Sequence, residues 1–156
     1  MSVIKLEYAE LRDKPKDLLI KTIYNNFKDL STNPKLKHTP EEIKKILNSK
    51  KAVVLLYMDN DKICGYLVAE EMKLFDRRQI MYISYIYVAP SYRNKGIGHK
   101  LMNYITAVTE TKRLDGIMLI YDTRKAYLRN FYDKQGFMVD FALRRYEDDE
   151  VFYKVI

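Results

Sequence analysis

The hydrophobic and polar positions along the chain predict a sheet of several strands. "AVVLLYMD" (52–59) is a nearly continuous apolar run, and "QIMYISYIYV" (79–88) is rich in the β-branched and aromatic residues that favour strands. "KICGYLVAEEMKLF" (62–75) returns between them after the Asn60–Asp61 turn, so the three segments predict a meander. The other predicted strands are a first strand over Val3, Leu6 and Tyr8, a buried strand "GIMLIYD" (116–122), and two closing strands, "VDFALRRY" (139–146) and "EVFYKVI" (150–156).

Apolar residues at helical spacing predict four helices between these strands. The clearest helix start is at Thr39, Pro40 and Glu42, which form a capping-box pattern with proline at the first helical position. The predicted helices are residues 15–30, a short helix that follows Thr39, a helix from about Gly98 to Lys112, and residues 125–136, which end at Gly136.

The order of these elements is β-α-α-β-β-β-α-β-α-β-β, which predicts an α+β fold, a mixed sheet with helices on its faces. Nothing in the sequence resembles a linker or a repeat, so we expect a single domain over residues 1–156. No apolar run is long enough to span a membrane, and the N-terminus has no signal-peptide pattern. We therefore expect a cytoplasmic protein that does not act at a membrane.

Composition narrows the function classes. The formal net charge of +7 favours anionic partners such as nucleotides, coenzymes or nucleic acid, although most of these charges are spread among acids as on an ordinary solvated surface. The single cysteine, Cys64, cannot form an internal disulfide, and with only His38 and His99 beside it no metal site is expected. Cys64 lies in a predicted strand, where a cysteine usually packs as a small apolar residue.

The stretch "YISYIYVAPSYRNKGIGHKLMNYI" leads from a strand through a turn with Gly96 and Gly98 into a helix. The first N–H groups of a helix have no partner within it and carry partial positive charge, so such a turn attracts anions, phosphates above all. Glycines let a phosphate approach the backbone, but two glycines at a turn also occur simply to relieve strain. The turn lacks the Lys-Ser/Thr ending of a P-loop and the third glycine of the dinucleotide fingerprint.

Residues 93–98, Arg-Asn-Lys-Gly-Ile-Gly, resemble the Arg/Gln-x-x-Gly-x-Gly/Ala turn of the GNAT superfamily of acetyl-CoA-dependent N-acetyltransferases. The preceding "IYVAP" and the later "NFYDKQGF" are also similar to that family, and the resemblance is strongest from Met81 to Phe137. It implies a central mixed, mostly antiparallel sheet of six to seven strands with about four helices on its faces. It also implies acetyl-CoA as the acetyl donor, with no metal.

The resemblance further implies roles for individual residues. The turn would hold the coenzyme A pyrophosphate, and the pantetheine arm would run along the end of the preceding strand, which would splay from "GIMLIYD"; one N–H near Val88 would point at the thioester carbonyl. Tyr132 would be the general acid that protonates the departing thiolate, although without the motif it would be taken for a packing residue. The implied coenzyme-binding residues are Ile86, Tyr87, Val88, Arg93, Asn94, Lys95, Gly96, Ile97, Gly98, His99 and Lys100.

The chain departs from the family pattern at the general base. Ser84 stands where many members carry a glutamate, and no acid occurs between Met81 and Pro90. The candidates for a substitute are Asp122, which is equally suited to cap the next helix, and one of Glu70 and Glu71, which alternate in a strand and so face opposite sides. Water chains that end at Tyr82 or Tyr121 are further alternatives.

The expected function is transfer of an acetyl group from acetyl-CoA to a primary amine by direct attack on the thioester. A GNAT-like sensor that binds acetyl-CoA without catalysis, suggested by Ser84, is one alternative, and a basic nucleic-acid-binding module is another. The second is disfavoured because no nucleic-acid-binding motif occurs, so no nucleic-acid partner is expected. The acceptor stays open between small-molecule and protein amines, and the family also allows a homodimer.

Overall fold

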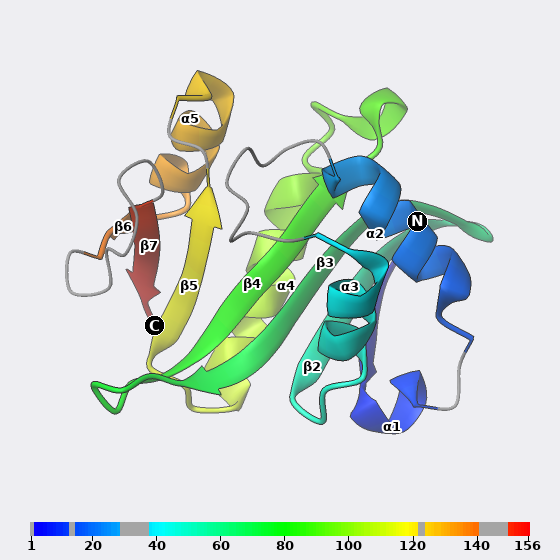
Figure 1. The fold of residues 1–156 in the computed structure, drawn as a ribbon. Coiled ribbons are helices and arrows are strands. Elements are labelled where there is room, and N and C mark those ends of the chain that lie inside the picture. Colours follow the sequence, from blue (N-terminus) through cyan, green and yellow to red (C-terminus); the bar gives the residue numbers. More distant parts are fainter. Residues whose placement is uncertain (1, 13–14, 29–37, 122–123, 141–149) are drawn as a thin grey trace.

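The structure is a computed structural model that describes residues 2–12, 15–28, 38–121, 124–140 and 150–156. Its fold is a single seven-stranded sheet with helices on both faces (Figure 1). The elements in chain order are β1 (Ser2–Glu7), α1 (Tyr8–Leu11), α2 (Asp17–Phe27), α3 (Pro40–Leu47), β2 (Ala52–Asp59), β3 (Lys62–Lys73), β4 (Gln79–Val88), a 3-10 turn η1 (Pro90–Tyr92), α4 (Ile97–Thr111), β5 (Gly116–Tyr121), α5 (Ala126–Lys134), β6 (Met138–Val139) and β7 (Glu150–Val155).

The strands are ordered β1-β2-β3-β4-β5-β7-β6 across the sheet. Every neighbouring pair is antiparallel except β4 and β5, which are parallel and are connected through α4. The predicted α+β class and the mixed, mostly antiparallel sheet are therefore confirmed.

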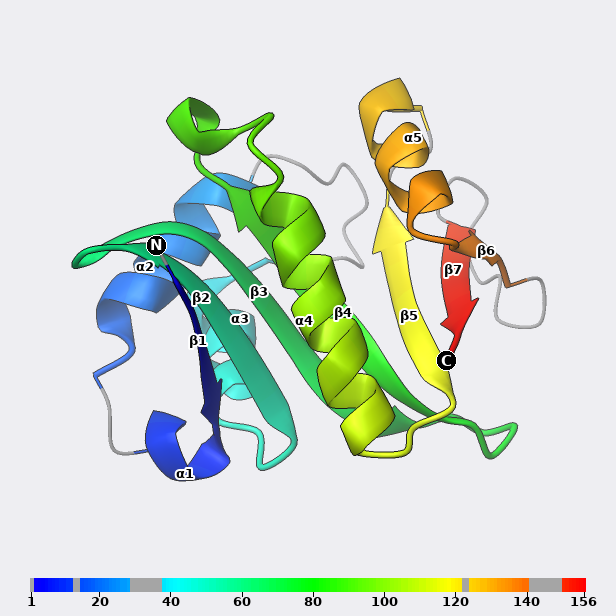
Figure 2. The same ribbon diagram turned by 180° about the vertical axis from the view of Figure 1, so that it is seen from behind.

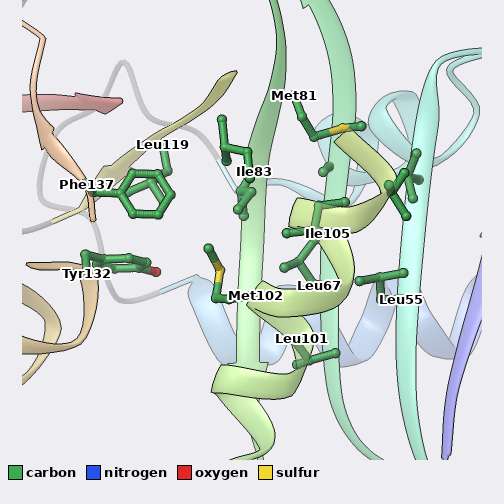
Figure 3. Close-up of a cluster of buried hydrophobic side chains, with 14 of the residues drawn as sticks. Leu55, Leu67, Met81, Ile83, Leu101, Met102, Ile105, Leu119, Tyr132 and Phe137 are labelled. Carbon is green, nitrogen blue, oxygen red and sulfur yellow. The ribbon is translucent and has the colours of Figure 1, made fainter. Parts of the chain in front are cut away.

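Two buried clusters lie on opposite faces of the sheet. On one face, α4 crosses the strands and packs Leu101, Met102 and Ile105 onto it, and α5 adds Tyr132 to the same cluster. Figure 2 shows α4 in front of the strands, and Figure 3 shows this cluster in close-up. On the other face, α2 and α3 cover a second cluster with residues such as Ile23.

The helix and strand predictions agree with the structure at most positions. The strands predicted at 52–59 and 79–88 have those bounds, and the Thr39 hydroxyl accepts a hydrogen bond from the Glu42 N–H at 3.2 Å, as a helix cap should. The first strand was predicted to include Tyr8, which is wrong. Glu7 instead caps a short helix, because the Glu10 carboxylate accepts from the Glu7 N–H at 3.0 Å, so Tyr8 begins α1.

A β-bulge divides β4. Val68 on β3 faces Tyr85, but the next residue, Ala69, faces Ile83, which leaves Ser84 as an extra residue on β4. The bulge reverses the side-chain alternation: Met81 and Ile83 pack with the α4 cluster before it, whereas Tyr85 packs with the α2–α3 cluster after it. The faces of the last part of β4 are therefore set by the bulge at Ser84.

Candidate active site

The turn that precedes α4 has two residues with left-handed backbone. Asn94 has φ 62° and Gly96 has φ 78°, and this conformation lets the chain reverse direction from η1 into the helix. The first helical hydrogen bond runs from the Lys100 N–H to the Gly96 carbonyl at 3.0 Å. The N–H groups that precede it in the helix therefore have no acceptor within α4; they belong to Ile97, Gly98 and His99.

The side chains of the turn provide positive charge and fix its position. Arg93 donates from Nε to the Val88 carbonyl oxygen at 2.8 Å, and its guanidinium carbon lies 5.4 Å from the centre of the Tyr87 ring. These contacts tie the turn to the end of β4. Arg93, Asn94, Lys95, His99 and Lys100 are exposed, whereas the Ile97 side chain is buried in the core.

Strands β4 and β5 diverge beside this turn. Their parallel pairing ends at Tyr82 and Met118, although β4 continues to Val88 and β5 to Tyr121. Figures 1 and 2 show the two strands separating toward the end where α4 and α5 begin. The expected splay of these strands is present.

The glycines of the site allow close packing around the divergence. A Cβ atom on Gly98 would lie 3.4 Å from Phe131 Cζ on α5 and 4.0 Å from Val88 Cγ2, so Gly98 lies between β4 and α5. A Cβ on Gly65 of β3 would lie 3.3 Å from Ile97 Cγ2, so the absent side chain lets the first turn of α4 rest on the sheet. Gly65 belongs to no sequence motif, so its role in this packing could not be predicted from the sequence.

Tyr132 lies on α5, beside the same divergence. Its side chain is 5% exposed, stacks on Tyr121 at 4.8 Å between ring centres and meets Phe131 and Phe137 edge-on. Figure 3 shows its hydroxyl pointing from α5 toward Met102 and β4. Burial first, and then the neighbouring Tyr121, raise the pKa of Tyr132 far above its ordinary value, so the phenol stays protonated and can donate a hydrogen bond.

Of the predicted candidates for the general base, the structure describes Glu70 and Glu71. Asp122 lies outside the described residues. Glu71 is 3.7 Å from Lys112 Nζ, at the C-terminal end of α4, a helix length from the glycine turn. Glu70 on β3 is paired with Tyr82 on β4. Burial, and to a smaller extent the charge of Glu70, raises the pKa of Tyr82 to about 12. Neither glutamate lies at the turn.

The described residues next to this site include neither a reactive cysteine nor a metal-binding group. Cys64 is buried, donates from Sγ to the Tyr57 carbonyl at 3.2 Å, and has a pKa raised by burial, which suits a packing residue. No group of three or more His, Cys, Asp or Glu side chains that could hold a metal ion occurs within the described residues. In the same part of the chain, no helix is long and apolar enough to cross a membrane.

Comparison with known proteins places this geometry in a family. The model of the acetyltransferase (GNAT) family matches residues 20–137, which is more than half of the chain. The chain belongs to this family. The match includes the glycine turn, the divergent strands and Tyr132. A search of curated proteins gives no significant match.

Solved structures share the GNAT fold over nearly the full chain. One is described as the NatC complex bound to Gag peptide and CoA (TM-score 0.72, 19% identity, covering 100% of this chain and 99% of that one). Another is Arabidopsis thaliana NAA60 with a bisubstrate analogue (0.71, 14%, 99% and 98%). A third is the aminoglycoside acetyltransferase meta-AAC0020 from an uncultured soil metagenomic sample, in complex with trehalose (0.68, 19%, 93% and 93%). At these identities the likeness concerns the fold.

Proposed function

We propose that this GNAT protein transfers an acetyl group from acetyl-CoA to a primary amine by direct attack on the thioester. The observation that carries the proposal is the coincidence of three features: the N–H groups at the start of α4, the end of β4–β5 pairing at Tyr82, and the Tyr132 hydroxyl that points toward the divergence. Each feature serves a different part of acetyl-CoA.

The pyrophosphate would bind the backbone of residues 93–100. Three N–H groups without helical acceptors, the dipole of a 15-residue helix and the exposed cations Lys95 and Lys100 all favour an anion there. The pantetheine arm would then lie along Ile86, Tyr87 and Val88. Among the described residues, the backbone of this segment is not paired with β5. An N–H near Val88 would stabilise the oxyanion that forms when the thioester carbonyl is attacked.

Tyr132 would supply the proton for the leaving group. As the amine nitrogen bonds to the carbonyl carbon and the C–S bond breaks, the departing thiolate takes the phenolic proton. Burial keeps Tyr132 protonated, so its hydroxyl hydrogen-bonds to the sulfur as charge develops there; the proton passes to the thiolate as the C–S bond breaks, and bulk solvent then reprotonates Tyr132. The amine loses its own proton to a separate base.

The acceptor class rests on related structures. One structure that shares the fold holds a peptide together with CoA, and another is an aminoglycoside acetyltransferase. Peptides and aminoglycosides both carry amines. Amines are therefore the first acceptors to test, from both the peptide and the small-molecule classes.

The decisive experiment measures free thiol release from acetyl-CoA with three amine classes: a peptide with a free N-terminus, an aminoglycoside and a polyamine. Amine-dependent release, with a mass increase of one acetyl group on the acceptor, would support the proposal. Binding of acetyl-CoA in a calorimeter without transfer to any amine would favour the sensor alternative. Absence of acetyl-CoA binding would refute both.

A further inference from the structure

A histidine and a tyrosine meet on the sheet face opposite α4. His38 Nδ1 lies 3.2 Å from the Tyr85 hydroxyl oxygen, and their ring centres are 5.5 Å apart. Phe27 of α2 packs against Tyr85 at 4.9 Å and against His38 at 6.1 Å. Tyr85 is buried and His38 is half-buried, so the imidazole is held by aromatic rings while part of it stays accessible.

This pair lies beside the diverging part of β4. Tyr85 is the first residue after the bulge at Ser84, three positions beyond the last residue of β4 that pairs with β5. The bulge turns Tyr85 to the α2–α3 face, away from the cluster under α4. The only other histidine of the chain, His99, is in the first turn of α4, where its Nδ1 lies 2.7 Å from Gln135 Nε2.

The direction of attack selects this face for the acceptor. If the start of α4 holds the coenzyme phosphates, the pantetheine arm enters the divergence from the α4 side. A nucleophile attacks a carbonyl carbon from a side that the donor leaves open, so the amine has to approach from the α2–α3 face. A base that serves the amine therefore belongs on that face, whereas Tyr132, which serves the thiol, belongs on the α4 face.

We propose that His38 accepts the proton of the attacking amine and that Tyr85 positions its imidazole. The inference rests on the function proposed above and assigns the base that Ser84 cannot provide. Nδ1 is engaged by Tyr85, so the proton would be taken at Nε2: the amine N–H bond breaks, the Nε2–H bond forms, and the resulting imidazolium releases a proton to solvent.

The surroundings of His38 suit this role. Burial lowers the pKa of His38, so the imidazole is neutral and able to take a proton near neutral pH. Burial also raises the pKa of Tyr85 to about 12, so its hydroxyl remains a neutral partner for Nδ1. Phe27, which contacts the pair from α2, carries no charge. Among the residues that the structure describes, the titratable and charged groups around the pair are Tyr82 and Tyr87 on β4, Tyr66 on β3, Glu42 on α3 and Arg93, whose guanidinium lies over Tyr87.

The test compares His38→Asn with Tyr85→Phe and a control, Lys44→Asn, which is exposed on α3. Asparagine places a polar atom near the position of Nδ1, so it retains a partner for Tyr85 but has no basic nitrogen. We measure kcat for the best amine between pH 5.5 and 9, acetyl-CoA affinity by calorimetry, and the thermal midpoint. Loss of a general base lowers kcat by roughly 100-fold or more.

We expect His38→Asn to keep acetyl-CoA affinity and thermal midpoint while its kcat falls and the acid limb of the pH profile disappears. In Tyr85→Phe the limb should move to lower pH, because the imidazolium loses a hydrogen-bond acceptor. If the wild type transfers acetyl and His38→Asn has the same kcat and the same acid limb, the role of His38 is refuted and the proposed function stands. A fall in kcat matched by an equal loss of acetyl-CoA affinity would refute the role of His38 as well. Acetyl-CoA binding without transfer by the wild type would remove the proposed function itself, and this assignment with it.

Discussion

A carboxylate placed at Gly98 gives a direct measure of whether the turn binds phosphate. A Cβ there would be 3.4 Å from Phe131 Cζ and 4.0 Å from Val88 Cγ2, which are ordinary van der Waals separations. A short side chain is therefore accommodated between the end of β4 and α5. Gly98→Asp adds charge at this place, and Gly98→Asn adds the same shape without charge, so the difference between the two variants isolates electrostatic repulsion.

The size of the effect follows from Coulomb's law. Two unit charges about 4 Å apart interact with roughly 1 kcal/mol in water and about 4 kcal/mol at an effective dielectric constant near 20. The turn is exposed at Arg93, Asn94 and Lys95, so the lower half of this range applies. A loss of about 1 to 2.5 kcal/mol corresponds to a roughly 5- to 60-fold weaker Kd, since each 1.4 kcal/mol is a factor of ten.

The assay is calorimetric titration with acetyl-CoA of the wild type and both variants, at low and at high salt. We expect Gly98→Asp to bind more weakly than Gly98→Asn by this factor, and the gap to narrow as salt screens the charges. Matching thermal midpoints would establish that both variants are folded. Equal Kd values for the two variants at low salt would refute phosphate binding at the turn.

Three further predictions concern single residues. Tyr132→Phe, which retains the ring stacking, should lower kcat by about 100-fold or more in the thiol-release assay and leave acetyl-CoA affinity unchanged; unaltered kcat would exclude Tyr132 as the acid. Gly116→Ala should destabilise the fold by about 1–3 kcal/mol in urea unfolding, since the Cβ would clash with the Tyr153 ring and lie 2.5 Å from the Lys154 carbonyl; an unchanged midpoint would contradict this packing. Burial lowers the pKa of His38, so below pH 6.5, the ordinary value, the unfolded chain binds more protons at this residue than the folded one and the free energy of unfolding falls. Between pH 7 and pH 5 this free energy should fall less in His38→Asn than in the wild type. Equal falls in the two proteins would refute the coupling.

The sequence was sufficient for the elements and for the place of the turn. The apolar runs at 52–59 and 79–88 end in turn residues, so their bounds could be predicted to the residue. Gly96 was expected in a tight turn, and its φ of 78° requires a residue that tolerates left-handed backbone. Local rules of this kind do not depend on distant parts of the chain.

The faces of β4 could not be predicted from the same pattern. Strict alternation from Met81 would place Tyr85 on the α4 face with Ile83. The bulge arises from the pairing register with Val68 and Ala69 and not from the residue type of Ser84, so a sequence pattern carries no sign of it. For the same reason His38, which is distant in sequence from Tyr85, was considered only as a metal ligand.

The bulge links the two halves of the proposed chemistry. Acetyl transfer from a thioester to an amine gives one proton to the departing thiolate and removes one from the amine. Tyr132 lies in the α4 cluster and His38 lies against Tyr85 on the opposite face, so the sheet itself separates the two proton transfers. The separation depends on the extra residue at Ser84, because without it Tyr85 would face α4. Deleting Ser84 should therefore abolish transfer, and it should also weaken acetyl-CoA binding, because Ile86, Tyr87 and Val88 would turn to the opposite faces; the thiol-release assay and calorimetry measure the two effects. Retained transfer in a folded deletion variant would contradict the assignment of the two faces.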